Sequence, residues 1–184
     1  MIKNEITLVK EIQQGNYNAF THIFETYYAR IYTFLLIKSN WNKFDAEETT
    51  TTTFIKAFEN IKNFSTNNDK SSFTARLYKI AYHSFLDMKK CKKNPCENSV
   101  NDECDTISQD YISYFQKHIQ AEQILTYLEE IWSDKKDLFI LRIWNNLKYE
   151  EIAQILWKRS STCRKDFSKL IKKIANHFKY RIDD

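Results

Sequence analysis

The sequence of 184 residues contains only one glycine and one proline. Tight hairpins and phosphate-binding loops require glycine, and multi-stranded sandwiches require many turn residues. The scarcity of both residues argues against these architectures and leaves helices joined by polar loops. Because 42% of the residues are hydrophobic and 15% are aromatic, one mid-sized domain or two small ones can form a core.

Long apolar runs are also lacking. None approaches the roughly 20 residues that a transmembrane helix needs, and the N-terminus has no basic stretch followed by an apolar one. We therefore expect a cytoplasmic protein without membrane insertion. Cysteines are few, and three of the four lie in a polar stretch where a disulfide would stabilise little. Reduced thiols are expected at Cys91, Cys96, Cys104 and Cys163.

Charge is distributed in three blocks. Residues 1–93 carry 14 basic and 9 acidic side chains, residues 94–130 carry 1 and 8, and residues 131–184 carry 13 and 7. Two basic segments thus flank an acidic one, a distribution that indicates two contacts with a polyanion. Nucleic acid is the first partner that this pattern predicts.

Apolar residues recur at helical spacing in the first part of the chain. They predict a short helix around residues 8–12 and a long one over residues 20–35, with Gly15 in the position of a left-handed C-terminal cap. A third helix is predicted to start at Asp45, because this residue and Glu48 have the spacing of a capping box.

Five consecutive threonines, residues 49–53, weaken the third helix because β-branched side chains lose freedom in a helix. Tertiary packing must hold this stretch. A polar loop at 63–72 precedes a fourth helix over residues 73–88. Near the edge of its apolar face, Tyr78 and Tyr82 fit the core or the surface equally well.

A linker composition follows at residues 94–118, which are polar and acidic and contain the single proline. We therefore predict an all-α fold with two helical domains, 1–93 and 119–184, joined by an acidic flexible linker. The helices of the second domain are predicted at 119–131, 134–144, 149–156 and 161–178.

The last two of these helices have the spacing of a helix-turn-helix motif. One side of the final helix is apolar and is predicted to be buried, with Cys163, Phe167, Leu170, Ile171 and Ile174. The other side is basic and polar, with Arg164, Lys165, Ser168, Lys169 and Lys172. Such a helix can lie in the major groove, its cations on phosphates and Arg164 at a guanine edge. The alternative is a solvated basic helix favoured by the helix dipole.

A second candidate surface combines the 63–72 loop with the basic and aromatic side of the fourth helix. Single-stranded DNA needs stacking faces, polar groups for base edges and cations for the backbone. These groups are predicted at Phe64, Asn67, Asn68, Lys70, Arg76, Lys79, Tyr82 and His83. Asn67 and Asn68 also suit an ordinary turn.

Three motifs then stand out together. The stretches DAEETTTTTFIKAF (45–58) and SFTARLYKIA (72–81) resemble the second region of extracytoplasmic-function (ECF) RNA polymerase sigma factors of the sigma-70 family. The stretch LFILRIWNNLKYEEIAQIL (138–156) resembles their fourth region, and Thr162 opens its recognition helix. The resemblance implies a non-enzymatic protein without cofactor that directs core polymerase to promoters and promotes DNA melting.

The resemblance also implies roles for individual residues. The third helix would dock on the β′ clamp helices of the polymerase through Asp45, Glu47, Glu48, Thr51, Thr52 and Lys56. The loop around Phe64 would capture a flipped base of the −10 element. The fourth region would contact the β flap and read the −35 element, with the turn residues Arg159, Ser160, Ser161 and Thr162 added to the basic side of the last helix. An anti-sigma protein would be a further partner.

Several positions depart from the family pattern. Threonines at 49–52 stand where leucine, glutamine and glutamate are usual, and Arg76 stands where tryptophan is usual. Lys148 replaces a serine or threonine cap, a loss of about 1 kcal/mol unless another group substitutes. Trp157 replaces the glycine of the helix-turn-helix and is expected to shift the recognition helix, and Lys158 replaces an apolar turn residue.

Other readings follow from the same residues. Cys91, Cys96, Cys104 and His118 suggest a zinc site, but a Cys-x2-Cys pair is missing, which argues against metal binding. His22 and His118 fit ordinary structural or surface roles.

Two further alternatives concern the whole chain. It could be a stand-alone helix-turn-helix regulator whose N-terminal helices serve dimerisation or sensing, or a degenerate sigma-like protein that binds polymerase without melting DNA.

Overall fold

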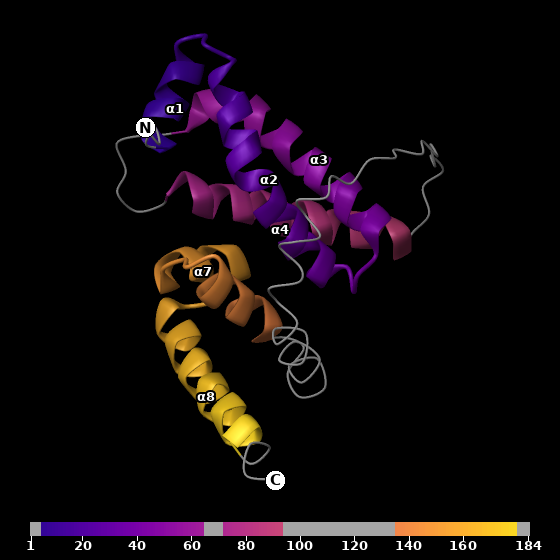
Figure 1. Ribbon diagram of the computed structural model, residues 1–184, viewed down its shortest axis with the longest axis vertical. Coiled ribbons are helices and arrows are strands. Elements are labelled where there is room, and N and C mark those ends of the chain that lie inside the picture. The colour runs from indigo at the N-terminus through magenta and orange to yellow at the C-terminus, as the bar shows by residue number, and fades with distance from the viewer. Residues whose placement is uncertain (1–4, 65–71, 94–134, 180–184) are drawn as a thin grey trace. The chain divides into compact units, whose positions relative to one another are not determined.

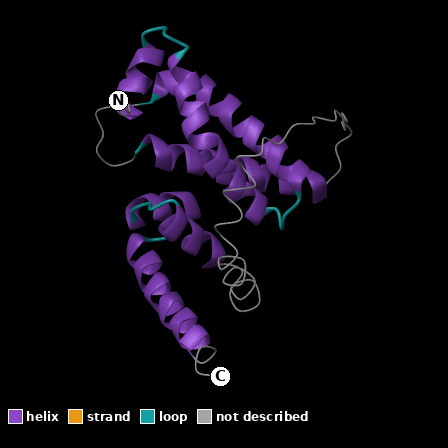
Figure 2. Ribbon diagram, in the orientation of Figure 1, coloured by secondary structure: helices purple, strands orange, loops and turns teal. Residues whose placement is uncertain are grey.

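A computed structural model describes residues 5–64, 72–93 and 135–179, and every regular element within these ranges is helical (Figure 2). The all-α fold class is thereby confirmed. The chain divides into two compact units, Met1–Cys96 and Glu97–Asp184. The predicted linker at 94–118 and the predicted helix at 119–131 lie outside the described residues. Among the described helices, none has the length and apolar character to cross a membrane.

The N-terminal unit is a bundle in which α3 packs against both α2 and α4, while α1 packs on α2 and on the short η1 (Figure 1). Its elements are α1 (Glu5–Gln13), α2 (Ala19–Lys38), α3 (Lys43–Glu59), η1 (Ile61–Asn63) and α4 (Phe73–Lys93).

The core of this unit is apolar and aromatic. Tyr78, for which core and surface were equally compatible with the sequence, is fully buried, and its ring meets that of Phe34 edge to face at 5.4 Å between centroids. The other large side chains buried most deeply in this unit are Ile12, Ile23, Ile31, Leu35, Ile37 and Leu77.

The corner between α1 and α2 has the backbone that the sequence predicts. Gly15 has a φ of 99°, its N–H donates to the carbonyl of Ile12 at 3.0 Å, and the Asn16 N–H donates to the carbonyl of Glu11 at 2.9 Å. These two bonds form a Schellman motif, which satisfies carbonyls that the helix end leaves without partners.

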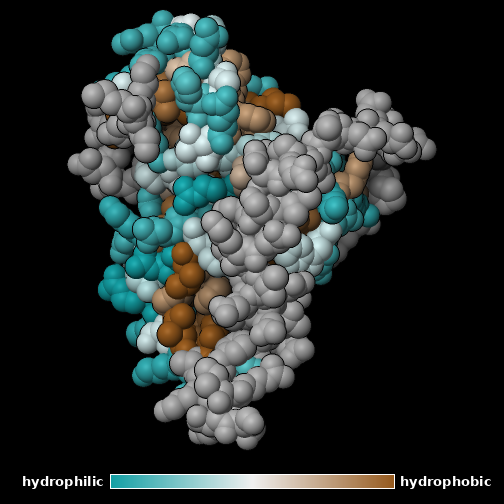
Figure 3. All heavy atoms as spheres, viewed as in Figure 1, coloured by the Kyte–Doolittle hydropathy of each residue, from teal (hydrophilic) through white to brown (hydrophobic). Residues whose placement is uncertain are grey.

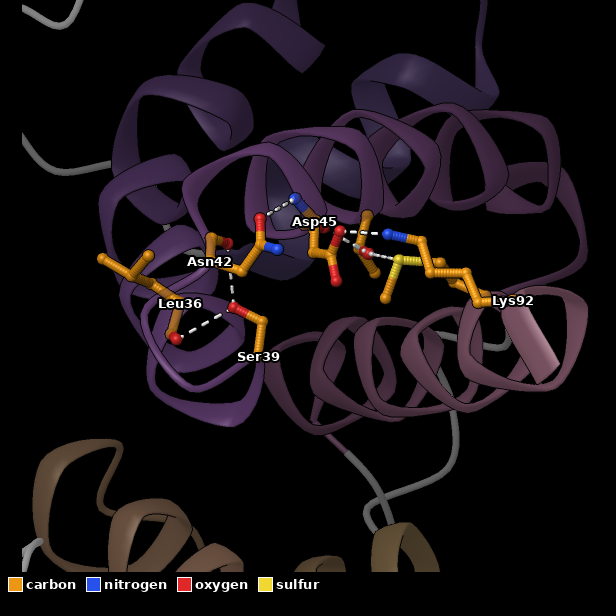
Figure 4. Close-up of polar contacts among 7 residues, drawn as sticks. Leu36, Ser39, Asn42, Asp45 and Lys92 are labelled. Carbon is orange, nitrogen blue, oxygen red and sulfur yellow. Dashed lines mark hydrogen bonds and ion pairs between the residues drawn. The ribbon is translucent and has the colours of Figure 1, made fainter. Parts of the chain in front are cut away.

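The start of α3 differs from the prediction. The helix begins at Lys43, and its cap is Asn42, whose Oδ1 accepts from the Asp45 N–H at 3.1 Å. Asp45 is therefore inside the first turn, and its buried carboxylate pairs with the Lys92 ammonium near the end of α4 (Figure 4). Asn42 has the extended backbone that a cap requires, and the alternative cap at Asp45 is lost because its side chain turns inward.

The threonine stretch is helical, and packing holds it as predicted. Thr49, Thr50 and Thr53 are buried, and each Oγ1 donates to the carbonyl four residues earlier at 2.6–2.7 Å. A buried hydroxyl without such a bond would cost about 1–3 kcal/mol. The local bonds therefore let polar side chains fill a buried helix face.

The C-terminal unit contains a helix-turn-helix. Residues 135–139 are helical and continue into the wider π-helical turn η2 (Ile140–Trp144), which is followed by α7 (Tyr149–Leu156) and α8 (Ser160–Lys179) (Figure 1). The Asn145 N–H and Nδ2 both donate to the Ile140 carbonyl at 3.2 Å and close that turn. Its core includes Leu138, Ile140, Leu141, Leu147, Ile152, Ile155, Cys163 and Leu170.

We predict that Gly15→Ala destabilises the protein by about 1 kcal/mol, because an L side chain is strained at this positive φ. A Cβ at this position meets no heavy atom within 4 Å, so strain is the only expected cost. Urea denaturation measures the change, with Gln14→Ala as the matched control. An unchanged free energy of unfolding for Gly15→Ala would contradict the prediction.

Candidate nucleic-acid and protein interfaces

A basic and aromatic surface runs along α4. Arg76, Lys79 and His83 recur at helical spacing, so they share one side of the helix, and Tyr82 is next to them. All four are half-exposed. We define these residues, together with Lys38, as the α4 surface.

Lys38, at the end of α2, is part of this surface although the sequence did not indicate it. Its Nζ lies 4.4 Å from the centroid of the Tyr82 ring and 5.2 Å from that of Phe85, both within cation–π range. The contact joins residues 44 positions apart, so no local sequence signal could have found it. It settles the position of Tyr82, whose ring is half-exposed beside a cation rather than in the core.

His83 adds hydrogen-bonding capacity rather than charge. Burial, with the positive charges of Lys79 and Lys90, lowers the pKa of His83, while Asp87 opposes the shift. The neutral imidazole is therefore favoured at pH 7. Its ring meets that of Tyr82 edge to face at 6.0 Å.

The prediction that Phe64 offers a stacking face to DNA is wrong. Its side chain is 9% exposed, its ring packs edge to face on Phe73 at 5.6 Å, and the Arg76 guanidinium lies 5.5 Å from its centroid. The ring is needed to close the core between η1 and α4, which explains the difference. The predicted contacts Asn67, Asn68 and Lys70 lie outside the described residues.

The predicted polymerase-binding residues on α3 are divided by exposure. Glu48 and Thr51 are exposed, whereas Glu47, Thr52 and Lys56 are half-buried. Asp45 is buried against Lys92 and does not present its carboxylate to a partner.

Two of the half-buried residues on α3 interact with neighbouring helices of the bundle, one by a hydrogen bond and one through its charge. Lys56 Nζ donates to Ser84 Oγ at 3.3 Å. Burial raises the pKa of Tyr32 to about 12, and the carboxylate of Glu47 and the neighbouring Tyr28 add to this shift. The hydrogen bond to Ser84 fixes Lys56 between α3 and α4, and the carboxylate of Glu47 lies close enough to Tyr32 of α2 to act on its pKa.

Apolar side chains beside these residues are also exposed, which the sequence did not predict. Phe44, Ile55 and Phe58 on α3 are 53%, 54% and 39% exposed. Phe58 also contacts Phe20 and Tyr17 at ring distances of 5.0 and 5.7 Å. The outer side of α3 thus combines acidic, hydroxyl and apolar groups, which suits a protein partner better than a polyanion.

The last helix, α8, is amphipathic, as Figure 3 shows over the C-terminal unit. The predicted outward residues Arg164, Lys165, Ser168, Lys169 and Lys172 are all exposed. On the other side Cys163 and Leu170 are buried, and Phe167 and Ile174 pack against Phe139 and Leu170. Ile171, predicted to be buried, is 37% exposed because it lies at the edge of this stripe.

The turn between α7 and α8 accommodates tryptophan. Trp157 adopts a left-handed backbone, φ 56° and ψ 38°, and its side chain is 74% exposed. The missing cap at Lys148 is offset, because Glu151 Oε2 accepts from the Lys148 N–H at 2.8 Å. A capping box has two reciprocal hydrogen bonds. The bond to the backbone N–H of the cap residue is present here, but the bond to the cap side chain is not, because a lysine side chain has no acceptor.

The N-terminal part of α8 contacts the beginning of α7. Arg164 lies 3.5 Å from the Glu150 carboxylate and 5.5 Å from the centroid of the Tyr149 ring. Arg159, Ser161 and Thr162 are exposed and Ser160 is half-buried, so three of the four predicted turn contacts are accessible.

A bundle with a basic, aromatic helix face and a unit with a helix-turn-helix define an all-helical protein with the features of nucleic-acid binding. Within the described ranges no group of three or more histidine, cysteine or acidic side chains is placed to hold a metal. Cys96, Cys104 and His118 of the alternative zinc site lie outside those ranges.

Comparison with known proteins gives a more specific similarity. The chain is 28% identical over 142 residues to RNA polymerase sigma factor YlaC of Bacillus subtilis (strain 168), covering 75% of this chain and 80% of that protein. Its fold matches a chain in the structure of CnrH in complex with the cytosolic domain of CnrY, with a TM-score of 0.64, 13% identity and coverage of 96% and 97%. No family model matches. The similarity to sigma factors that the motifs predicted is confirmed.

We predict that His83 makes the folded protein less stable in acid. Because the folded-state pKa lies below the unfolded value of about 6.5, the unfolded chain binds the proton more readily as pH falls below that value. The free energy of unfolding of the wild type should therefore fall relative to His83→Gln between pH 7.5 and 5. Urea titrations at several pH values measure this, with His22→Gln as the control; a relative rise would show that Asp87 dominates the environment.

Proposed function

We propose that this protein is an RNA polymerase sigma factor of the ECF type, which binds core polymerase, directs it to promoters and promotes DNA melting. The observation that carries the proposal is the similarity to sigma factor YlaC over three quarters of the chain. It is supported by two features on separate units, the α4 surface and the helix-turn-helix. No catalytic role or cofactor is proposed.

The α4 surface is proposed to hold melted DNA of the −10 element. Lys38, Arg76 and Lys79 supply cations for the backbone, and the half-exposed Tyr82 ring supplies a stacking face. His83 is mostly neutral at pH 7, so it is proposed to act as a hydrogen-bonding group.

The recognition helix α8 is proposed to lie in the major groove of the −35 element. Lys165, Lys169 and Lys172 are exposed and suit phosphate contacts. Arg164 would exchange its exposed pairing with Glu150 for a guanine edge, an exchange of low cost because surface ion pairs contribute about 0–1 kcal/mol.

The outer side of α3 is proposed to bind core polymerase at the β′ clamp helices, through Glu48 and Thr51 with the exposed Ile55 and Phe58 beside them. The β flap is the proposed partner of the C-terminal unit. An anti-sigma protein is proposed as well, with support from the fold match to a structure in which CnrH is bound to the cytosolic domain of CnrY. A cytoplasmic location is proposed together with these partners.

Transcription in vitro tests the proposal. Purified protein added to core polymerase should start transcription at defined sites in a fragment library of the host genome. A control reaction contains core polymerase alone. If the protein instead leaves core polymerase unbound and gives a specific footprint by itself, it is a stand-alone regulator. Core binding without initiation would indicate a degenerate sigma-like protein.

We predict that Lys79→Glu abolishes open complexes while core binding stays intact, because a carboxylate at this position repels the melted strand. Permanganate reactivity of unpaired thymines measures opening, and competition binding measures affinity for core. The matched control is Lys10→Glu, at an exposed lysine on α1. Unchanged initiation by Lys79→Glu would count against the role of the α4 surface.

We predict a separate effect for the recognition helix. Lys165→Gln and Lys169→Gln should each reduce the slope of log K against log salt concentration by about 1, the loss of one phosphate contact. Holoenzyme binding to a promoter duplex over a salt series measures the slope. Lys10→Gln should leave it unaltered, and a wild-type slope in both α8 variants would exclude phosphate contacts there.

A further inference from the structure

Helix α1 holds the chain immediately before residues 65–71, which belong to the loop predicted to capture a base of the −10 element. The Gln13 side chain donates through Nε2 to the Ile61 carbonyl at 2.9 Å and to the Phe64 carbonyl at 2.8 Å. A primary amide has two N–H groups, so one side chain can satisfy both carbonyls. Gln13 is half-buried, and α1 packs against η1, which contains Ile61.

The same helix holds the chain just after that segment. Glu5, in the first turn of α1, accepts through Oε1 from the Tyr27 hydroxyl and, at 2.8 Å, from the Thr74 hydroxyl. The two hydroxyl oxygens are 2.9 Å apart. Burial, the hydrogen bond to Glu5 and its charge raise the pKa of Tyr27, so the phenol remains a donor. Thr74 is the second residue of α4.

The spacing between these anchors is set by the helix itself. Glu5 and Gln13 are eight residues apart, which corresponds to about 12 Å along a helix axis. Leu8, Val9 and Ile12 are buried between them, so α1 is fixed to the bundle along its length. Both flanks of residues 65–71 are therefore attached to one rigid element.

We propose that α1 sets the geometry of promoter opening by fixing the two flanks of this segment, with Gln13 and Glu5 as positioning residues for the −10 contacts. The proposal rests on the proposed sigma function. Neither side chain needs to touch DNA: Gln13 acts through the carbonyls at Ile61 and Phe64, and Glu5 acts through Thr74 and hence through the first turn of α4, which carries Arg76.

The test replaces Gln13 with residues that keep or remove the donor. Gln13→Leu removes both N–H groups, Gln13→Lys keeps a donor of similar reach, and Gln14→Leu is the control at the adjacent exposed position. Full-length protein is assembled with core polymerase on a promoter and on variants with single substitutions in the −10 element. Open complexes are measured at saturating holoenzyme.

Gln13→Leu should lower the preference for the cognate −10 base about tenfold, a typical effect of losing one base contact. Affinity for core polymerase should stay as in the wild type, and Gln13→Lys should recover most of the preference. If Gln13→Leu opens cognate and substituted promoters in the wild-type ratio, or if its loss is matched by weaker core binding, the proposal is overturned.

The second anchor supplies an independent check. Thr74→Val removes the hydroxyl that donates a hydrogen bond to Glu5, while it keeps the shape of the side chain. If both anchors act on the same contacts, the double variant with Gln13→Leu should lose less base preference than the product of the single losses. Multiplicative losses would overturn the idea of a shared geometry.

Failure of the sigma function is distinguishable from failure of this proposal. Amide hydrogen exchange needs no polymerase. Exchange of residues 61–64 should accelerate in Gln13→Leu but not in Gln14→Leu, and exchange of residues 72–76 should accelerate in Thr74→Val. Wild-type protein that fails to bind core would overturn the proposed function. Accelerated exchange together with unchanged base preference would overturn the positioning role alone.

Discussion

The N-terminal unit depends on the burial of one side of α3 between α2 and α4. That side is partly hydroxylic, and it is stable there because each buried threonine of α3 bonds to its own helix backbone. The hydroxyls therefore need no partner on α2 or α4, and the helices can approach closely. The ion pair of Asp45 with Lys92 ties the beginning of α3 to the end of α4. Because α3 is fixed in this way, its outer side and the exposed side of α4 keep a constant distance and orientation relative to each other.

Much of this architecture could be read from helical periodicity. The number and order of α-helices in the first unit, the glycine corner and the two sides of α8 follow from residue spacing, which is a local property, whereas the short η1 was not predicted. What the sequence could not supply are contacts between distant residues. Asn42 rather than Asp45 caps α3 because Lys92 attracts the aspartate. Phe64 is buried because the core needs its ring, and Lys38 joins the α4 surface through a contact with Tyr82.

The candidate surfaces share one principle of construction. Each helix that carries a proposed contact uses its other side to pack, so the position of the functional groups is fixed by the core. On α8 the buried Cys163 and Leu170 orient the exposed lysines, and burial raises the pKa of the Cys163 thiol, which suits a packing role. On α4 the buried Tyr78 and Leu77 do the same for Lys79. Hydrogen bonds from α1 then tie the flanks of residues 65–71 to this core.

The tryptophan in the turn of the helix-turn-helix has a practical consequence. A glycine at this position would be spectroscopically silent, whereas Trp157 is an indole exposed to solvent immediately before α8. Its emission responds to the polarity around the ring, so duplex DNA seated on α8 should alter its intensity and wavelength. The departure from the family pattern thus supplies an intrinsic fluorophore beside α8, and replacing the other three tryptophans, Trp41, Trp132 and Trp144, would isolate its signal.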